Sequence, residues 1–115
     1  MTANSSITTV LASGIAALLL GAAMPVFAVD ADAAQALAKK SNCMKCHSVS
    51  AKKEGPPFKE TAAKYKGKAD AEQKLIVHLT TNPKVKVDGK EEEHDNLKTK
   101  NEADVRNVVQ WILSQ

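Results

Sequence analysis

Apolar residues recur with the period of an α-helix in the last part of the chain. They are spaced i, i+3, i+4 and i+7, which places them on one helical face: Val105, Val108, Val109 and Ile112. Thr99 or Asn101 can begin this helix, because a short polar side chain there can bond to the first free backbone N–H groups. We expect the helix to continue to Gln115.

Three further segments are predicted to be helices. Asp32–Lys40 is rich in Ala, begins with an acidic residue and ends with basic ones, which suits the helix dipole. Phe58–Lys66 is expected to form a short helix. Asp70 and Gln73 have the spacing of an N-terminal capping box, and the helix that they begin is expected to end near Pro83.

Two polar stretches are expected to connect these helices. Ser48–Pro57 is a predicted loop, and Lys84–Lys100, which contains Asp88-Gly89, is predicted to be a long loop. We find no segment that alternates between polar and apolar residues as a half-buried strand does. The sequence therefore predicts an all-α fold of about four short helices.

The N-terminal residues form a separate block. All charged residues, 16 basic and 13 acidic, lie at or after Asp30. Val10–Ala23 is almost entirely apolar, and Val26-Phe27-Ala28 places small residues where a signal peptidase cleaves. We expect residues 1–28 to be a cleaved signal peptide for export to the periplasm, and residues 29–115 to form one domain. The alternative is a retained membrane anchor, since the apolar stretch just reaches the about 20 residues of a membrane span.

Charge and aromatic content narrow the function classes. The net charge of +3 is modest, and basic residues are not interleaved with aromatic ones, so nucleic-acid binding is not indicated. Nine lysines lie between residues 39 and 68, whereas acidic residues gather at 91–95. Such separation suits docking to charged partners.

The domain has few aromatic residues to fill a core, namely Phe58, Tyr65 and Trp111. A bound cofactor would supply the missing apolar bulk.

The segment Cys43-Met44-Lys45-Cys46-His47 carries the candidate chemistry. Two cysteines at this spacing can bond to the two vinyl groups of one haem, and the adjacent histidine can ligate the iron. A disulfide of the thioredoxin type needs a βαβ context, which the helical pattern does not provide. A zinc site would have to use the same cysteines with His78 and His94, which are 16 residues apart, whereas the usual spacing has only three to five residues between the histidines. We predict one covalently bound haem c, with His47 as the proximal ligand.

From the first helix to the C-terminus, the chain resembles the class I cytochromes c, above all the short bacterial electron carriers. The resemblance rests on the segment 43–47 and on three others: Gly55-Pro56-Pro57-Phe58-Lys59-Glu60, Ala62-Ala63-Lys64-Tyr65 and Val109-Gln110-Trp111-Ile112-Leu113-Ser114-Gln115. It implies the class I cytochrome c fold, with helices around one haem. It also implies that the carbonyl group of Pro56 accepts a hydrogen bond from His47, which fixes the ring of that ligand.

The sequence departs from the family at the second axial ligand. The family places a methionine about sixteen residues before the Trp of the last helix. Here the methionines are Met1, Met24 and Met44, none of them near that position. His94 lies 17 residues before Trp111, so we expect His94 to be the distal ligand of a bis-histidine haem.

Other distal ligands stay open at this stage. His78 lies among apolar residues of a predicted helix, so it is an alternative ligand or a contact of a haem propionate. Four lysines are further alternatives, although an amine must lose its proton before it ligates iron: Lys84, Lys86, Lys90 and Lys98. An open sixth position is the last option.

The function expected from these residues is electron transfer between periplasmic or membrane redox proteins. No nucleophile–base pair and no pair of acids stands out, so the chain is not predicted to be an enzyme. Lys45, Lys52 and Lys53 are expected to steer an acidic partner toward the haem edge. The alternative function is haem-based binding or sensing of a small ligand at an open or labile sixth position.

Overall fold

The computed structural model describes Gly21 and residues 28–115. The predicted signal peptide therefore lies outside the described residues, apart from Gly21 and Ala28. No helix within the described residues has the length and apolar character needed to cross a bilayer.

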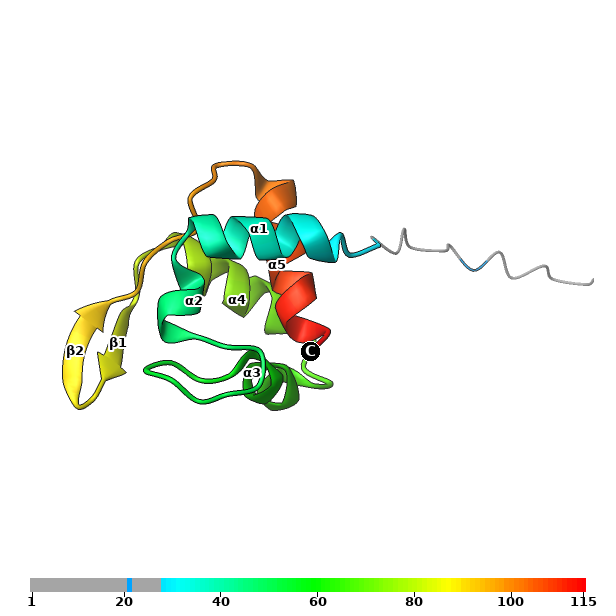
Figure 1. The fold of residues 1–115 in the computed structure, drawn as a ribbon. Coiled ribbons are helices and arrows are strands. Elements are labelled where there is room, and N and C mark those ends of the chain that lie inside the picture. Colours follow the sequence, from blue (N-terminus) through cyan, green and yellow to red (C-terminus); the bar gives the residue numbers. More distant parts are fainter. Residues whose placement is uncertain (1–20, 22–27) are drawn as a thin grey trace, which may run out of the picture.

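Helix α5 (Glu102–Leu113) is the element against which the other main helices pack (Figure 1). It contacts α1 (Ala31–Lys40), α3 (Phe58–Tyr65) and α4 (Ala71–Thr80). The face predicted from the i, i+3, i+4, i+7 spacing is buried, together with the ring of Trp111. The four helices predicted from the sequence are confirmed, with ends that differ by a few residues.

Small and branched apolar side chains make most of the core. Ala34 and Ala38 of α1 are almost fully buried, which lets α1 approach α5 closely. The ring of Phe58 meets that of Trp111 edge-on, with 5.3 Å between the ring centres. The other members of the core are Leu75, Leu79, Leu97, Val105, Val108, Val109 and Ile112.

The helix starts differ in how well the sequence predicts them. The side chain of Asn101 accepts a hydrogen bond from the N–H of Ala103 at 2.9 Å, so Asn101 caps α5 as expected. The capping box predicted for Asp70 and Gln73 is wrong, because the side chain of Asp70 bonds to no backbone N–H of α4. Its carboxylate pairs instead with the ammonium group of Lys74 at 2.8 Å.

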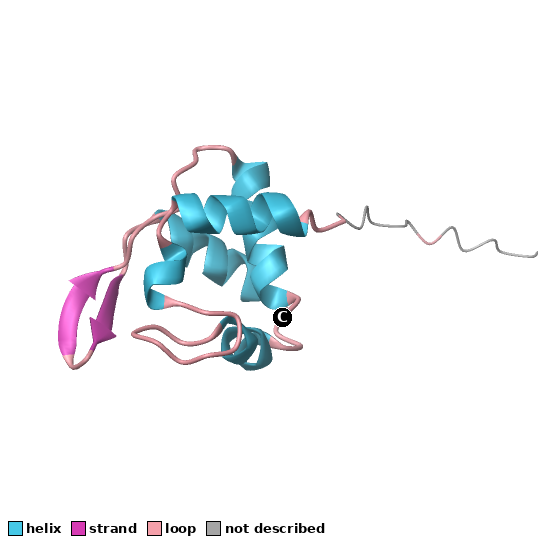
Figure 2. Cartoon of the chain, viewed as in Figure 1, coloured by secondary structure: helices cyan, strands magenta, loops and turns pink. Residues whose placement is uncertain are grey.

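The segment predicted as one long loop contains a β-hairpin, which Figure 2 shows beside the helices. Strand β1 (Lys84–Val87) pairs antiparallel with β2 (Lys90–Glu93). Asp88 and Gly89 have φ values of 49° and 80°, as expected for the two central residues of a tight hairpin turn. The prediction that no strand is present was wrong here, and the other regular elements of the described fold are helices.

Candidate haem site

The cysteine motif forms one helical turn directly after α1. This turn is α2 (Cys43–Cys46), and it begins after Asn42, whose φ of 62° breaks the chain direction. The buried Ser41 connects this turn to the segment before α5, because its hydroxyl accepts a hydrogen bond from the N–H of Lys98 at 2.9 Å. Both cysteines are free and half-buried on the same short turn.

The surroundings of the two thiols keep them protonated. Burial is the main cause that raises the pKa of Cys43. A hydrogen bond from the Cys46 thiol to the Glu54 carboxylate, 3.2 Å long, is the main cause that raises the pKa of Cys46. Oxidation follows thiolate character, so both cysteines are disfavoured as targets of oxidation before they react with another group. Sequence reasoning did not find Glu54, because nothing in its pattern relates it to Cys46.

His47 follows α2, and its ring is held from two sides. Its Nδ1 lies 2.8 Å from the carbonyl oxygen of Pro56, the contact that the resemblance implied. An N–H at Nδ1 donates to that oxygen, which leaves Nε2 free to ligate a metal. The ring stacks on Phe58 with 5.3 Å between the ring centres.

The close approach of the Pro56 turn depends on Gly55. A Cβ atom at residue 55 would lie 2.7 Å from Nδ1 of His47, nearer than any ordinary contact. The N–H of Gly55 donates to the carbonyl of Cys46 at 2.7 Å, which fastens the turn to α2. The Gly-Pro pair therefore matters for geometry as well as for the carbonyl that it presents.

His94 is the first residue after β2, in the segment that connects the hairpin to the helices. Its ring centre lies 6.1 Å from that of His47 and 4.4 Å from that of His78. Burial is the main cause that lowers the pKa of His94 and of His78. Both imidazoles therefore favour the neutral form, in which a histidine ligates a metal. The structure brings three histidines together, from the residue after α2, from α4 and from the end of the hairpin.

The donor set fits a haem iron. The Nδ1 atom of His94 is buried and, in the part of the chain that the structure describes, has no hydrogen-bond partner. A buried polar atom without a partner is costly unless another group engages that atom. A metal–imidazole bond is about 2 Å long and the ring centre lies about 1 Å beyond the nitrogen, so two imidazoles on one metal have centres at most about 6 Å apart. The separation of the His47 and His94 rings agrees with that value.

Protein side chains alone do not form a metal site here. Within the described ranges, no three side chains among His, Cys, Asp and Glu come close enough to hold a metal ion. The alternative of a zinc ion held by Cys43, Cys46, His78 and His94 is therefore not supported.

Comparison with known proteins decides the family. Residues 31–115 match the family model of cytochrome c. The chain belongs to the cytochrome c family. Cytochrome c-551 of Stutzerimonas stutzeri is 36% identical over 97 residues, which cover 84% of this chain and 90% of that protein.

Solved structures agree with this assignment. The class 1 cytochrome MtoD from Sideroxydans lithotrophicus ES-1 is 54% identical, with a TM-score of 0.73 over 76% of this chain and 97% of that one. Wild-type cytochrome c552 of Nitrosomonas europaea is 32% identical, with a TM-score of 0.55 over 70% of this chain and 96% of that one. The fold is thus that of a class I cytochrome c, and one covalently attached haem c fits Cys43 and Cys46. The relatives are named as cytochromes rather than enzymes, and the general function is electron transfer.

One of the lysines expected to dock a partner is engaged within the cytochrome. The ammonium group of Lys53 donates to the carbonyl of Met44 at 2.6 Å, so it closes the end of α2. Lys45 and Lys52 are exposed. These two remain the candidates for steering a partner.

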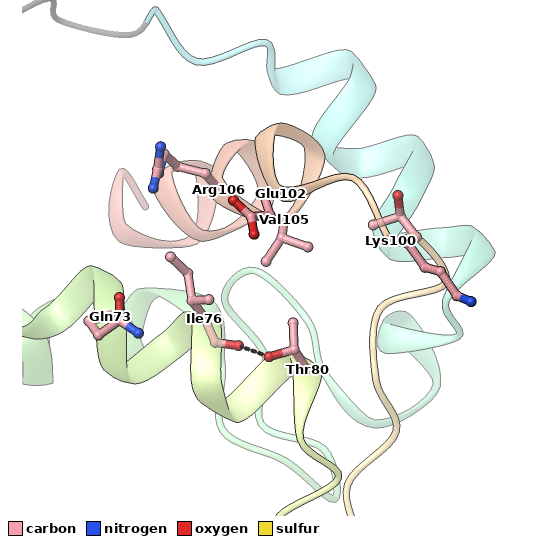
Figure 3. A pocket seen from close by; sticks show the side chains of 8 residues that line it. Gln73, Ile76, Thr80, Lys100, Glu102, Val105 and Arg106 are labelled. Carbon is pink, nitrogen blue, oxygen red and sulfur yellow. Dashed lines mark hydrogen bonds between the residues drawn. The ribbon is translucent and has the colours of Figure 1, made fainter.

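A pocket between α4 and α5 is separate from the three histidines (Figure 3). Ile76 of α4 and Val105 of α5 line it from opposite sides. Gln73, Ile76 and Thr80 are spaced so that they share one face of α4, whereas His78 projects from the other side of the helix. The pocket therefore does not belong to the haem site.

Proposed function

We propose that this cytochrome c is a periplasmic carrier of single electrons whose haem iron is ligated by His47 and His94. The bound haem supplies the redox chemistry, by cycling between Fe(II) and Fe(III). The chain attaches it through Cys43 and Cys46, orients His47 through Pro56 and limits access to the distal side. The observation that carries the proposal is the 6.1 Å separation of the His47 and His94 rings.

Three features favour His94 over the other distal candidates. It lies 17 residues before Trp111, next to the position at which the family has methionine, and no methionine lies near there. The centre of its ring lies 6.1 Å from that of His47, a separation suited to a shared metal. Its Nδ1 is buried without a partner among the described residues. We assign His78, 4.4 Å from His94, to packing beside the distal ligand or near a haem propionate.

Ligation by two imidazoles sets the direction of the reduction potential. A thioether ligand stabilises Fe(II), whereas two imidazoles favour Fe(III). We therefore expect a lower potential than in cytochromes of this family with His and Met ligands. This makes the protein suited to partners that operate at lower potential.

Export is part of the proposal. Residues 1–28 have the apolar run and the small-residue site of a signal peptide, and residues 29–115 form the domain that reaches the periplasm. Partners are redox proteins of the periplasm or of the membrane. Lys45 and Lys52 are exposed and positively charged, so the partners are expected to dock through an acidic surface.

The test is the reaction of the reduced protein with CO. The unaltered protein should bind CO slowly and only at high concentration, because His94 must leave first. His94→Ala should bind CO rapidly, whereas the matched variant His78→Ala should behave as the unaltered protein. Rapid CO binding by the unaltered protein would contradict an electron carrier with two stable ligands and would favour a ligand-binding function. Rapid binding by His78→Ala with slow binding by His94→Ala would reverse the ligand assignment.

A further inference from the structure

The backbone of His94 is bonded on both sides to the residues that follow α4. Its N–H donates to the carbonyl of Pro83 at 2.8 Å. Its carbonyl accepts a hydrogen bond from the side-chain amide of Asn82 at 3.1 Å. The point from which the imidazole projects is therefore fixed across the base of the hairpin rather than by the hairpin itself.

Asn96, in the segment that follows β2, completes this arrangement. Its Oδ1 accepts from the N–H of Asn82 at 2.8 Å. Its Nδ2 donates to the carbonyl of Thr80 at 3.0 Å and to Oδ1 of Asn82 at 2.8 Å. Two side-chain amides thus join the end of α4 to the segment that carries His94. One residue further on, the N–H of Leu97 donates to the carbonyl of Leu79 at 2.9 Å.

The conformation of Asn82 makes this closure possible. Its φ of 48° lies in the left-handed region, which asparagine tolerates better than most residues. The chain therefore turns sharply from α4 into β1 while the Asn82 side chain stays at the base of the hairpin.

The hairpin has little other support. Its strands pack mainly against each other rather than on the helices, and Figure 1 shows them projecting from the helical body. A two-stranded hairpin alone is at best marginally stable in water. The position of His94 must therefore depend on the hydrogen bonds at the base of the hairpin.

We propose that Asn82 and Asn96 form an amide clamp that positions His94 as the distal ligand and hinders its replacement by external ligands. This inference rests on the proposed function, since it takes His94 as the ligand. Asn82 and Asn96 are positioning residues, because they act through the backbone of His94.

The clamp has a measurable consequence. An external ligand binds only to molecules in which His94 has left, so its apparent affinity scales with the fraction of such molecules. Loss of the clamp bonds of one side chain should raise that fraction about tenfold, which corresponds to about 1.4 kcal/mol.

Two variants remove the clamp in different ways. Asn82→Gly keeps a residue that adopts a positive φ and deletes the amide that holds the His94 carbonyl. Asn96→Asp keeps an oxygen to accept from the N–H of Asn82 and removes both donated hydrogen bonds. Asn107→Ala is the matched control, because Asn107 makes two bonds of 2.9 and 2.8 Å to Asp30, outside the clamp.

The experiment is a titration of each ferric holoprotein with cyanide, together with its rate of binding and its reduction potential. Asn82→Gly and Asn96→Asp should each bind cyanide about tenfold more tightly and faster than the unaltered protein. Their reduction potentials should shift, because Fe(II) and Fe(III) differ in how strongly they bind the distal imidazole. Asn107→Ala should lose stability in urea but keep the affinity for cyanide and the potential.

Two results would overturn the clamp alone. One is unchanged cyanide affinity in both clamp variants while His94→Ala becomes high-spin. The other is a rise in affinity in Asn107→Ala as large as in the clamp variants, which would mean that general loss of stability is sufficient. A His94→Ala protein that keeps the unaltered low-spin spectrum would overturn both the clamp and the ligand assignment.

Discussion

At the scale of single residues, Gly55 limits what the proximal side of the haem site can contain. The Pro56 carbonyl reaches Nδ1 of His47 at 2.8 Å only because residue 55 has no side chain. The ring of His47 cannot easily move away from residue 55, because it stacks on Phe58, which in turn packs against Trp111. An added methyl group at residue 55 must therefore displace either the ligand or the turn.

Gly55→Ala should destabilise the holoprotein by about 1–3 kcal/mol, the usual cost of overpacking. It should also weaken the bond between His47 and Pro56 and so shift the reduction potential. Urea unfolding of the ferric protein measures the first effect, and a redox titration measures the second. The control is Gly67→Asn, at an open position with a φ of 74° that asparagine tolerates. Equal effects at both positions would show that the loss of glycine, rather than contact with His47, matters.

The sequence predicted the proximal residues more readily than their neighbours. Cys43, Cys46 and His47 belong to one short motif whose spacing is itself the signal. The bond between Cys46 and Glu54 and the bonds between Asn82 and Asn96 join residues 8 and 14 positions apart. No periodicity links such positions, so only the folded chain reveals these contacts.

At the scale of elements, helix α5 is the part whose loss the fold can least tolerate. Its buried face contacts α1, α3 and α4, and its first turn is capped by Asn101. This helix was predictable, because its apolar period and its cap are both local properties of the sequence.

Asn101→Ala should lower the free energy of unfolding by about 1 kcal/mol, because the N–H of Ala103 loses its partner. Asn101→Ser should retain most of the stability, because serine also caps helices. Urea denaturation of the holoproteins at neutral pH compares the two. An alanine variant as stable as the serine variant would show that the cap contributes nothing.

The hairpin was not predicted because its two strands give different signals. Lys84–Val87 alternates between polar and apolar residues, but over only four residues, and Lys90–Glu93 is polar throughout. The Asp88-Gly89 turn was the one strong hairpin signal, and it also suits an ordinary loop. The segment forms a hairpin rather than a loop because its two strands pair, and this pairing cannot be predicted from either strand alone.

The ion pair of α4 predicts a dependence of stability on pH. The bond to Lys74 is the main cause that lowers the pKa of Asp70. A carboxyl group whose pKa is lower in the folded state stabilises the fold above its unfolded pKa of about 3.9, and this contribution is lost as the pH falls through the folded pKa. Asp70→Asn should therefore be slightly less stable than the unaltered protein at pH 7 and equally stable at about pH 2.

The matched control for the pair is Lys74→Gln, which breaks the same ion pair from its other end. The double variant should lose no more stability than either single variant, as in a double-mutant cycle. Urea unfolding at both pH values measures all four proteins. A difference between Asp70→Asn and the unaltered protein that persists at low pH would contradict the ion pair as its cause.

At the scale of the whole molecule, charge is separated along the chain. Lysines dominate the segment that surrounds the haem attachment, and acidic residues gather at the end of the hairpin and beside His94. The net charge of +3 conceals this separation. We therefore expect one side of the molecule, rather than its total charge, to steer a partner.

Electron transfer from an anionic reagent to the ferric protein should therefore slow as salt is added, because exposed charges are screened beyond about 8 Å at physiological ionic strength. Reduction of the ferric protein by a small anionic reductant, followed by stopped flow, measures this. The variant Lys45→Gln/Lys52→Gln should show a weaker salt dependence than the unaltered protein, whereas Lys100→Gln, which lies beside the α4–α5 pocket, should not. Rates that do not respond to salt would contradict steering by these lysines.

Electron transfer, ligand access and the role of the amide clamp all depend on the two axial ligands of the iron, and the near-infrared spectrum of the ferric holoprotein identifies these ligands. Ligation by His47 and His94 predicts a low-spin haem without the weak iron–sulfur band of a methionine ligand, and a change to high spin in His94→Ala. A near-infrared iron–sulfur band in the unaltered protein, or an unchanged low-spin spectrum in His94→Ala, would contradict ligation by His47 and His94.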